Sequence, residues 1–366
     1  MVFLFLRSFL RRSQFALLSL SIWLCAIGLP VHAANLGHAF PIRSINSPIA
    51  GALVPGVPLP VLLAQLDPQG KARQSPVIRS KTGIAIVYPR AEEPYRGYFV
   101  SMMQGIEDRL SQRVGSYEVD NTADLDMLNS EFHRSGVRLV IALGRQGADV
   151  ASKLDKDFIV LEGGVVRLSD PGNINGISLT PDPALLFARL HILLPDVKRI
   201  IAVFDPSRSS WLIRLARAAA RAQGFDLTTV EAHDLAEAAS SYSQLFTKAD
   251  GRRDAIWVLP DSTTAEEGTL LPLVLRESWN HGMAVFSSNM GHLKNGVLFS
   301  MSSDHRELGR SLANTAMRIL SGDTSSKGIF PLRDVKIGIN SRTAKHLGIA
   351  PNAFQQRDYD FIYPEP

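Results

Sequence analysis

Polar and small side chains gather where predicted strands end, and such groups can hydrogen-bond a small ligand. An apolar run over residues 255–259 is followed by a polar cluster at residues 260–264. A second apolar run, residues 283–286, is followed by Ser287, Ser288 and Asn289. In open α/β sheets, ligands bind beyond the carboxyl ends of the strands, where helix N-termini also point. Both clusters are therefore candidate ligand-binding groups.

The segment between the two clusters has the pattern of a helix. Its apolar residues recur near helical spacing, and His281-Gly282 closes it: Leu270, Leu271, Val274, Leu275 and Trp279. A strand, a helix and a second strand of these lengths suit a crossover that joins parallel strands.

The same alternation of strands and helices runs through most of the chain. Over residues 83–170 the pattern predicts strands at 84–87, 117–119, 137–143 and 158–161, with helices at 95–114, 123–132 and 148–154. From residue 182 onward it predicts helices at 183–194, 236–246, 304–321 and 341–346, and strands at 199–204, 227–230, 296–300 and 335–339. Another helix is predicted to be capped by Ser209 or Ser210 and closed by Gly224, with Leu212, Leu215, Ala216 and Ala219 facing inward. We therefore predict an α/β protein made of two doubly wound units.

Residues at the predicted strand ends form the candidate binding set. This set comprises Tyr88, Arg90, Gly144, Arg145, Gln146, Glu162, Asp205, Ser209, Ser210, Asp261, Ser262, Thr263, Ser287, Ser288 and Asn289. The alternative is that they are ordinary turn and cap residues. If they face a cleft between two lobes, several should contact ligand. For Asp261 both roles remain open, with the ligand role favoured because Ser262, Thr263 and Thr264 could each cap the next helix instead.

Motifs for catalysis, nucleotide binding and metal binding are missing from the sequence. It contains no GxGxxG, GxxxxGK[ST], HExxH or GxSxG, and its nine histidines are scattered. His233-Asp234 and Glu266-Glu267 are read as solvated faces rather than acid/base pairs. We therefore expect no catalytic residue, no metal and no cofactor, and we predict a binding protein rather than an enzyme.

The first 33 residues have the pattern of a secretory signal peptide. Three arginines precede an apolar core at residues 15–29, and Val31-His32-Ala33 places small residues before a cleavage point at Ala34. The alternative is an uncleaved membrane anchor, for which the apolar core is short. Removing the three arginines lowers the formal charge from +4 to +1, which gives no electrostatic argument for a nucleic-acid partner. The one cysteine, Cys25, would be removed as well, so the mature chain needs no disulfide.

Residues 34–81 differ in composition from the rest of the chain. Prolines recur too often for a regular element to persist: Pro41, Pro48, Pro55, Pro58, Pro60, Pro68 and Pro76. We predict a disordered arm here and a folded body from Gly83 onward.

From about Asn173 onward the chain resembles the periplasmic substrate-binding proteins of ABC transporters, in the subgroup with the type I fold. The resemblance rests on several short stretches in order: NINGIS at 173–178, LPDVKRI at 194–200, DAIWVLPDS at 254–262, VFSS at 285–288, ELGR at 307–310, ILSG at 319–322 and INSRTAKHLGI at 339–349. Residues 83–170 match only in pattern.

This resemblance implies two Rossmann-like lobes with a small molecule, amino-acid-like, bound between them. It assigns residues 82–178 and about 296–328 to the first lobe, and residues 179–295 and about 329–366 to the second. Site residues carry over most directly at Asp205, Ser209, Asp261, Ser262, Ser287 and Ser288. We expect a monomeric, periplasmic protein that presents its ligand to the permease of an ABC transporter. Two alternatives remain: a sensor that presents ligand to a receptor, and an enzyme on a doubly wound scaffold.

Overall fold

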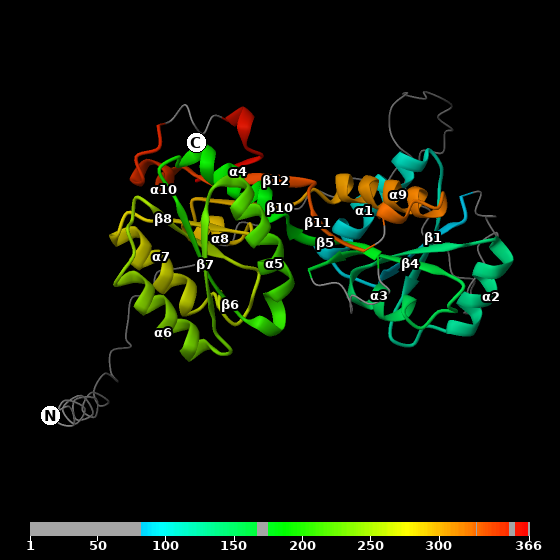
Figure 1. Ribbon diagram of the computed structural model, residues 1–366. Coiled ribbons are helices and arrows are strands. Elements are labelled where there is room, and N and C mark those ends of the chain that lie inside the picture. The colour runs from blue at the N-terminus through cyan, green and yellow to red at the C-terminus, as the bar shows by residue number, and fades with distance from the viewer. Residues whose placement is uncertain (1–81, 167–174, 327, 351–355, 365–366) are drawn as a thin grey trace, which may run out of the picture. The chain divides into compact units, whose positions relative to one another are not determined.

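The computed structural model describes residues 82–166, 175–326, 328–350 and 356–364, and two β-sheets organise them (Figure 1). The predicted signal peptide at residues 1–33 and the predicted arm at residues 34–81 lie outside the described residues. Within those ranges, no helix has the length and apolar character needed to cross a membrane.

The first sheet has the strand order β11-β5-β4-β3-β1-β2, and all its pairings are parallel. Its strands are β1 (Ile84–Pro89), β2 (Gly115–Val119), β3 (Leu139–Leu143), β4 (Ile159–Val165), β5 (Asn175–Pro181) and β11 (Ile329–Leu332). Helices cover both faces: α1 (Tyr95–Leu110) and α9 (His305–Leu320) on one, α2 (Leu125–Ser135) and α3 (Gly144–Ala151) on the other.

The alternation of side chains along β1 explains how one strand serves both faces. Ile84 and Ile86 pack into the core beneath α1 and α9, whereas Ala85 and Val87 pack beneath α2 and α3. Helices α1 and α9 cross so closely that a Cβ on Gly105 would lie 2.0 Å from the Arg306 carbonyl oxygen. Only glycine fits this crossing.

The second sheet has the order β13-β12-β10-β9-β8-β6-β7, with one antiparallel pairing between β10 and β12. Its strands are β6 (Arg199–Phe204), β7 (Asp226–Glu231), β8 (Asp254–Val258), β9 (Ala284–Ser287), β10 (Phe299–Ser303), β12 (Val335–Asn340) and β13 (Phe361–Tyr363). One face carries α4 (Pro183–Leu193), α5 (Pro206–Gln223) and α10 (Ser341–His346). The other carries α6 (Leu235–Phe246), α7 (Leu270–Asn280) and α8 (His292–Asn295). Two short 3₁₀ turns complete the described elements, η1 (Thr324–Ser326) and η3 (Gln356–Asp358).

Within the described residues, the chain passes between the two sheets at three neighbouring points. The passages follow β5 at Asp182, β10 at Asp304, and β11 at Arg333-Asp334. Backbone hydrogen bonds tie them together: Asp182 N donates to Leu332 O at 2.8 Å, and Asp304 N donates to Asp334 O at 2.9 Å. The lobe boundaries expected at residues 178, 296 and 328 therefore fall a few residues early. The reason is that β10 pairs with β9 and β12, while β11 pairs with β5.

Several predicted helix starts differ from the structure. Helix α5 begins at Pro206 and is capped by Asp205, so the predicted cap at Ser209 or Ser210 was wrong. Proline is favoured in the first helical turn because its missing N–H leaves no donor unpaired there, and this proline extends the helix toward the strand. Helix α3 begins at Gly144, directly after β3, rather than at residue 148. Strands β5 and β11 were not predicted, since neither has the strong apolar run of the central strands.

Candidate functional site

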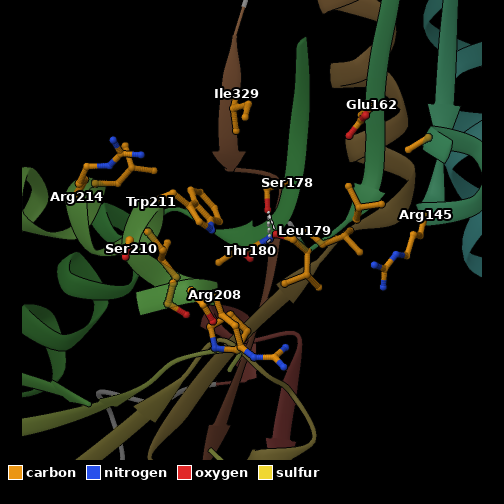
Figure 2. Close-up of a pocket in the computed structure, with 18 of the residues that line it drawn as sticks. Arg145, Glu162, Ser178, Leu179, Thr180, Arg208, Ser210, Trp211, Arg214 and Ile329 are labelled. Atoms are coloured by element: carbon orange, nitrogen blue, oxygen red, sulfur yellow. Dashed lines mark hydrogen bonds between the residues drawn. The ribbon is translucent and has the colours of Figure 1, made fainter. Parts of the chain in front are cut away.

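A cavity of ≈ 1210 Å³ lies where α5 of the second sheet meets α3, β4, β5 and β11 of the first (Figure 2). Its apolar walls are formed by Ala148, Val165, Val166, Leu179, Trp211, Leu212, Leu215, Pro206, Pro260 and Ile329. Its polar and charged lining consists of Arg145, Asp149, Glu162, Ser178, Thr180, Ser207, Arg208, Ser209, Ser210 and Arg214. An apolar cleft with a few convergent polar groups is the usual form of a small-molecule site.

The turn from β3 into α3 brings Arg145 into this cavity. Gly144 has φ +68°, a left-handed conformation that lets the helix start at the residue after the strand. A Cβ at this position would lie 2.9 Å from the ring of Phe99, so a larger residue has no room. Arg145 therefore stands in the first turn of α3, exposed, at the wall of the cavity.

Strand β5 forms the middle of the cavity wall and is held by two buried hydroxyls. Ser178 Oγ donates to Val166 O at 2.7 Å, and Thr180 Oγ1 donates to the same carbonyl at 3.2 Å (Figure 2). Leu179 lies between them and is half-buried. These bonds fix the end of β4 against β5, so the wall is held by contacts within the protein.

The opposite wall is the first half of α5. The core side of this helix carries Leu212, Ile213 and Ala216. The outer side carries Arg208, Trp211 and Leu215, spaced three and four residues apart, which places them on one face. Leu215 is 37 % exposed and lines the cavity, so its predicted inward orientation was wrong. Figure 2 shows the Trp211 ring beside Ser178 and Thr180.

The cavity lining contains more arginines than acidic residues. Three arginines and two acids line it. Among the described residues, Arg145 and Arg214 have no acid within ion-pair distance, and Arg208 Nε lies 3.4 Å from Asp205 Oδ2. Glu162 is 1 % exposed and already engaged with another residue. Among the described lining residues, arginines therefore outnumber acids by one.

Asp205 and Asp261, at the ends of β6 and β8, form a hydrogen-bonded network beneath α5. Asp261 Oδ2 accepts from Asp205 N at 2.8 Å and from Ser209 Oγ at 3.3 Å. Asp261 Oδ1 accepts from Thr263 N at 2.8 Å and Thr264 N at 3.3 Å. Both carboxylate oxygens of this buried residue are thus occupied within the second sheet's own turns.

The carboxylate oxygens of Asp205 also accept hydrogen bonds from neighbouring residues of the protein. Its Oδ1 accepts from Ser207 N at 2.9 Å and Ser207 Oγ at 2.7 Å, and its Oδ2 accepts from Thr263 Oγ1 at 3.0 Å. The hydrogen bond from the Ser207 hydroxyl, followed by the other donors and the nearby Arg208, holds the pKa of the Asp205 carboxyl below its ordinary value despite burial.

Residues at and after the end of β9 form a separate hydrogen-bonded cluster around the buried Ser287 and His292. Ser287 Oγ lies 2.8 Å from His292 Nδ1 and accepts from Asn289 N at 3.0 Å. His292 Nε2 lies 3.4 Å from Glu267 Oε1, while Ser288 Oγ accepts from Trp257 Nε1 at 3.3 Å. Burial lowers the pKa of His292, opposed by the Glu267 carboxylate. Ser287 is fully buried, so its hydroxyl serves this cluster and does not reach the cavity.

The remaining predicted site residues also lie away from the cavity lining. Arg90 Nε donates to Glu118 Oε1 at 2.7 Å, and Gln146 Nε2 donates to Asn121 Oδ1 at 3.3 Å. Tyr88 packs against the core of the first sheet, and burial raises the pKa of its hydroxyl. Ser262 is exposed on the turn after β8.

The cavity therefore contains four members of the predicted binding set: Arg145, Glu162, Ser209 and Ser210. Sequence reasoning missed Ser178, Thr180, Arg208, Trp211 and Arg214. The signal that could have found part of this group is the apolar pair on α5, Trp211 and Leu215. Trp211 is half-buried and packs partly against the core, whereas Leu215 is exposed. In the described part of the chain, no three His, Cys, Asp or Glu side chains are grouped to hold a metal ion.

A family model described as ABC transporter substrate binding protein matches residues 105–353 of this chain. Among solved structures, the ligand-free, open form of the substrate binding protein CD0873 from Clostridium difficile is 20% identical, with a TM-score of 0.53. That match covers 76% of this chain and 98% of the other.

Two other solved structures are similar with lower structural scores. An ABC domain in complex with L-Trp from Streptococcus pneumonia is 20% identical over 76% of this chain and 99% of that chain, with a TM-score of 0.46. A periplasmic ribose ABC transporter protein from Conexibacter woesei is 15% identical over 74% of this chain and 95% of that chain, with a TM-score of 0.43. No curated protein sequence matches this chain at a significant level.

Proposed function

Because this chain belongs to the family of ABC transporter substrate binding proteins, we propose that it captures a small organic ligand and presents it to a membrane permease. The observation that carries the proposal is the cavity of ≈ 1210 Å³ whose lining comes from elements of both sheets. Sites that bury most of a small ligand are apolar, with a few placed polar groups. We place the ligand, amino-acid-like in size, between α5 and the wall formed by α3, β4 and β5.

The binding residues we propose are those of the predicted set that line the cavity, together with the α5 side chains beside them. Trp211 offers a broad apolar surface, and Arg145 and Arg208 offer charged donors. The structural role of Asp205 and Asp261 is to hold the first turn of α5 in position through the network described above. These acids thus support the site from behind.

Ligand capture would favour closure of the two sheets on the cavity. The three neighbouring passages at Asp182, Asp304 and Asp334 form a narrow connection, and the cavity has lining residues on both sides of it. A ligand that contacts both sides stabilises the closed arrangement by its differential affinity for that state. A permease can then distinguish loaded from empty protein.

We further propose that the protein is exported as a monomer to the periplasm after removal of residues 1–33. The basic start, the apolar core and the small residues before Ala34 support this. N-terminal sequencing of the exported protein tests it, and we expect Ala34 as the first residue. A product that begins at Met1 would mean that the segment remains as an anchor.

Ligand capture is tested by a thermal-shift screen of amino acids and related metabolites against the purified protein. A ligand at 100 times its dissociation constant adds about 2.7 kcal/mol to the unfolding free energy. Binding of any hit should be lost in Trp211→Ala and retained in Trp279→Ala. Trp279 is the matched control, because it is 47 % exposed on α7 and stacks on His346 outside the cavity lining. The absence of any hit, or equal losses in both variants, would contradict the proposed site.

A further inference from the structure

The two helices that begin at the cavity carry arginine in their first turns. Arg145 is the second residue of α3, and Arg208 is the third residue of α5. A helix N-terminus carries partial positive charge, so a cation placed there is unfavourable and an anion favourable. Among helices that do not line the cavity, α2 and α6 carry Asp126 and Glu237 in their first turns. Helices α1, α9 and α10 each carry an arginine as their second residue: Arg96, Arg306 and Arg342. What distinguishes Arg145 and Arg208 is therefore their place in the cavity lining, where an anion could meet both the guanidinium groups and the helix N-termini.

These two arginines lie on opposite walls. In Figure 2 Arg145 extends from the side of the first sheet and Arg208 from the side of α5, with Trp211 on the same wall as Arg208. Arg208 approaches one acid, Asp205, at 3.4 Å, and that carboxylate already accepts from Ser207 and Thr263. Both guanidinium groups are exposed to the cavity and can donate to an anion in it.

Most of the acidic side chains near the cavity already interact with other groups of the protein. Glu162 is buried and engaged, and the oxygens of Asp205 and Asp261 accept hydrogen bonds from neighbouring turns. Asp149 remains, exposed on α3 four residues after Arg145. Among the described lining residues, a ligand ammonium therefore meets one exposed acid, against three arginines.

The rest of the lining is apolar and large enough for a ring or a branched chain. Its members include Trp211 and Leu215 on α5, Leu179 on β5, Val165 on β4 and Ile329 on β11. Such a surface binds the apolar body of a ligand whose charged end lies elsewhere in the cavity.

We propose that the ligand is a monoanionic carboxylic acid with an apolar body of amino-acid size and without a balancing ammonium group. Its carboxylate binds between Arg145 and Arg208 at the two helix N-termini, and its apolar body packs on Trp211. A single negative charge matches the excess of one positive charge among those lining residues that the structure describes. This inference rests on the proposed function and narrows the ligand class of that same cavity.

Two matched ligand series test the charge preference by calorimetric titration and thermal shift. One series is 3-phenylpropanoate, L-phenylalanine and 2-phenylethylamine, and the other is 4-methylpentanoate, L-leucine and 3-methylbutylamine. We expect the acid of each series to bind at least tenfold tighter than the amino acid, and the amine to give no shift. Equal or tighter binding of the amino acids would overturn the inference while leaving ligand capture intact. No binding by either acid would also overturn it, and the broader metabolite screen then decides the proposed function separately.

Variants of the arginines test the position of the carboxylate. Arg145→Gln and Arg208→Gln should each lower the affinity for 3-phenylpropanoate at least tenfold. Arg217→Gln is the matched control, because Arg217 lies on α5 outside the cavity lining and donates to Thr229 Oγ1 at 3.2 Å. Asp149→Asn should leave the affinity unchanged or raise it, since it removes a like charge.

The urea midpoint of each variant shows whether a weaker affinity comes from a lost ligand contact or from a destabilised fold. Removing a cation from a helix N-terminus should leave the urea midpoint of Arg145→Gln unchanged or higher. In Arg208→Gln the lost attraction to Asp205 opposes this gain, so its midpoint should stay close to that of the wild type. A weaker affinity at an undiminished midpoint supports the anion site. Unchanged affinity in both variants, or an equal loss in Arg217→Gln, rejects it.

Discussion

Two groups of side chains lie at the first half of α5, one behind the helix and one on its cavity side. Behind the helix, Asp205 and Asp261 direct their carboxylate oxygens to donors of the same turns. In front of it, Arg208 and Trp211 face the cavity. The position of a polar residue at a strand end therefore does not show whether that residue contacts a ligand or caps a turn or helix of the protein. The difference lies in whether the protein itself already satisfies the group.

The largest effect should follow from breaking the network behind α5. Asp261→Ala leaves Asp205 N and Thr263 N without their acceptor and should lower the unfolding free energy by about 3 kcal/mol. Urea denaturation measures it, with Ser262→Ala as the exposed neighbour that should be nearly neutral. Asp261→Asn should cost roughly half as much, because both carboxylate oxygens accept and an amide keeps one acceptor. A neutral Asp261→Asn variant with weakened ligand binding would return this residue to the ligand-binding group.

The next largest effect belongs to the cavity side of the helix. Trp211→Ala should weaken ligand binding at least tenfold, about 1.4 kcal/mol, while the half-buried ring contributes less to folding than the core residue Leu212. Calorimetric titration of this variant gives the change in affinity, and urea denaturation gives the change in unfolding free energy. A variant that loses stability but keeps its affinity would reverse the roles assigned to the two sides of α5.

A smaller effect should appear in the pH dependence of stability. The pKa of Asp205 is lowered in the folded state, so its ionised form favours folding. This contribution is complete above the ordinary pKa of 3.8 and is lost as the pH falls from there through the lower folded-state pKa. Asp205→Asn should flatten the acid limb of the stability curve and cost about 1 kcal/mol at neutral pH. An acid limb identical to that of the wild type would mean that the carboxylate is not stabilised by its donors.

The smallest effect is expected at Ser210. This exposed side chain lines the cavity and donates to Pro206 O of its own helix at 2.6 Å. Ser210→Ala should change the unfolding free energy by less than about 0.5 kcal/mol. Its effect on affinity then shows whether the hydroxyl contributes to binding. A large loss of stability would place Ser210 with the network behind the helix.

Much of the fold followed from the sequence, and the expected two-lobed α/β architecture is confirmed. The strong apolar runs of β3, β6 and β8 identified the central strands because a parallel strand covered on both faces is apolar at every position. Strands β5 and β11 were missed because Ser178, Thr180 and Pro331 interrupt any such run. Their strand geometry comes from pairing with each other and with β4.

The site followed from the sequence only in part. The family was readable from the sequence, and Arg145 and Glu162 of the predicted set line the cavity. Arg145 lies in the first turn of α3, and Glu162 lies within β4, which continues beyond the predicted strand to Val165. Trp211 was not found, because it stands in the middle of a helix whose apolar residues suit burial equally well. Which of its apolar residues pack inward depends on the sheet beneath it.

The sequence by itself determined the alternation of strands and helices, the family and the absence of catalytic motifs, since these depend on local pattern and residue type. The tertiary structure alone decided which polar groups remain available to a ligand. Asp261 and Arg208 look alike as charged residues at strand ends and helix starts. The folded chain surrounds Asp261 with donors and leaves Arg208 facing the cavity. Two of the donors to Asp261, Asp205 N and Ser209 Oγ, lie more than fifty residues away in the sequence, so no local pattern encodes them.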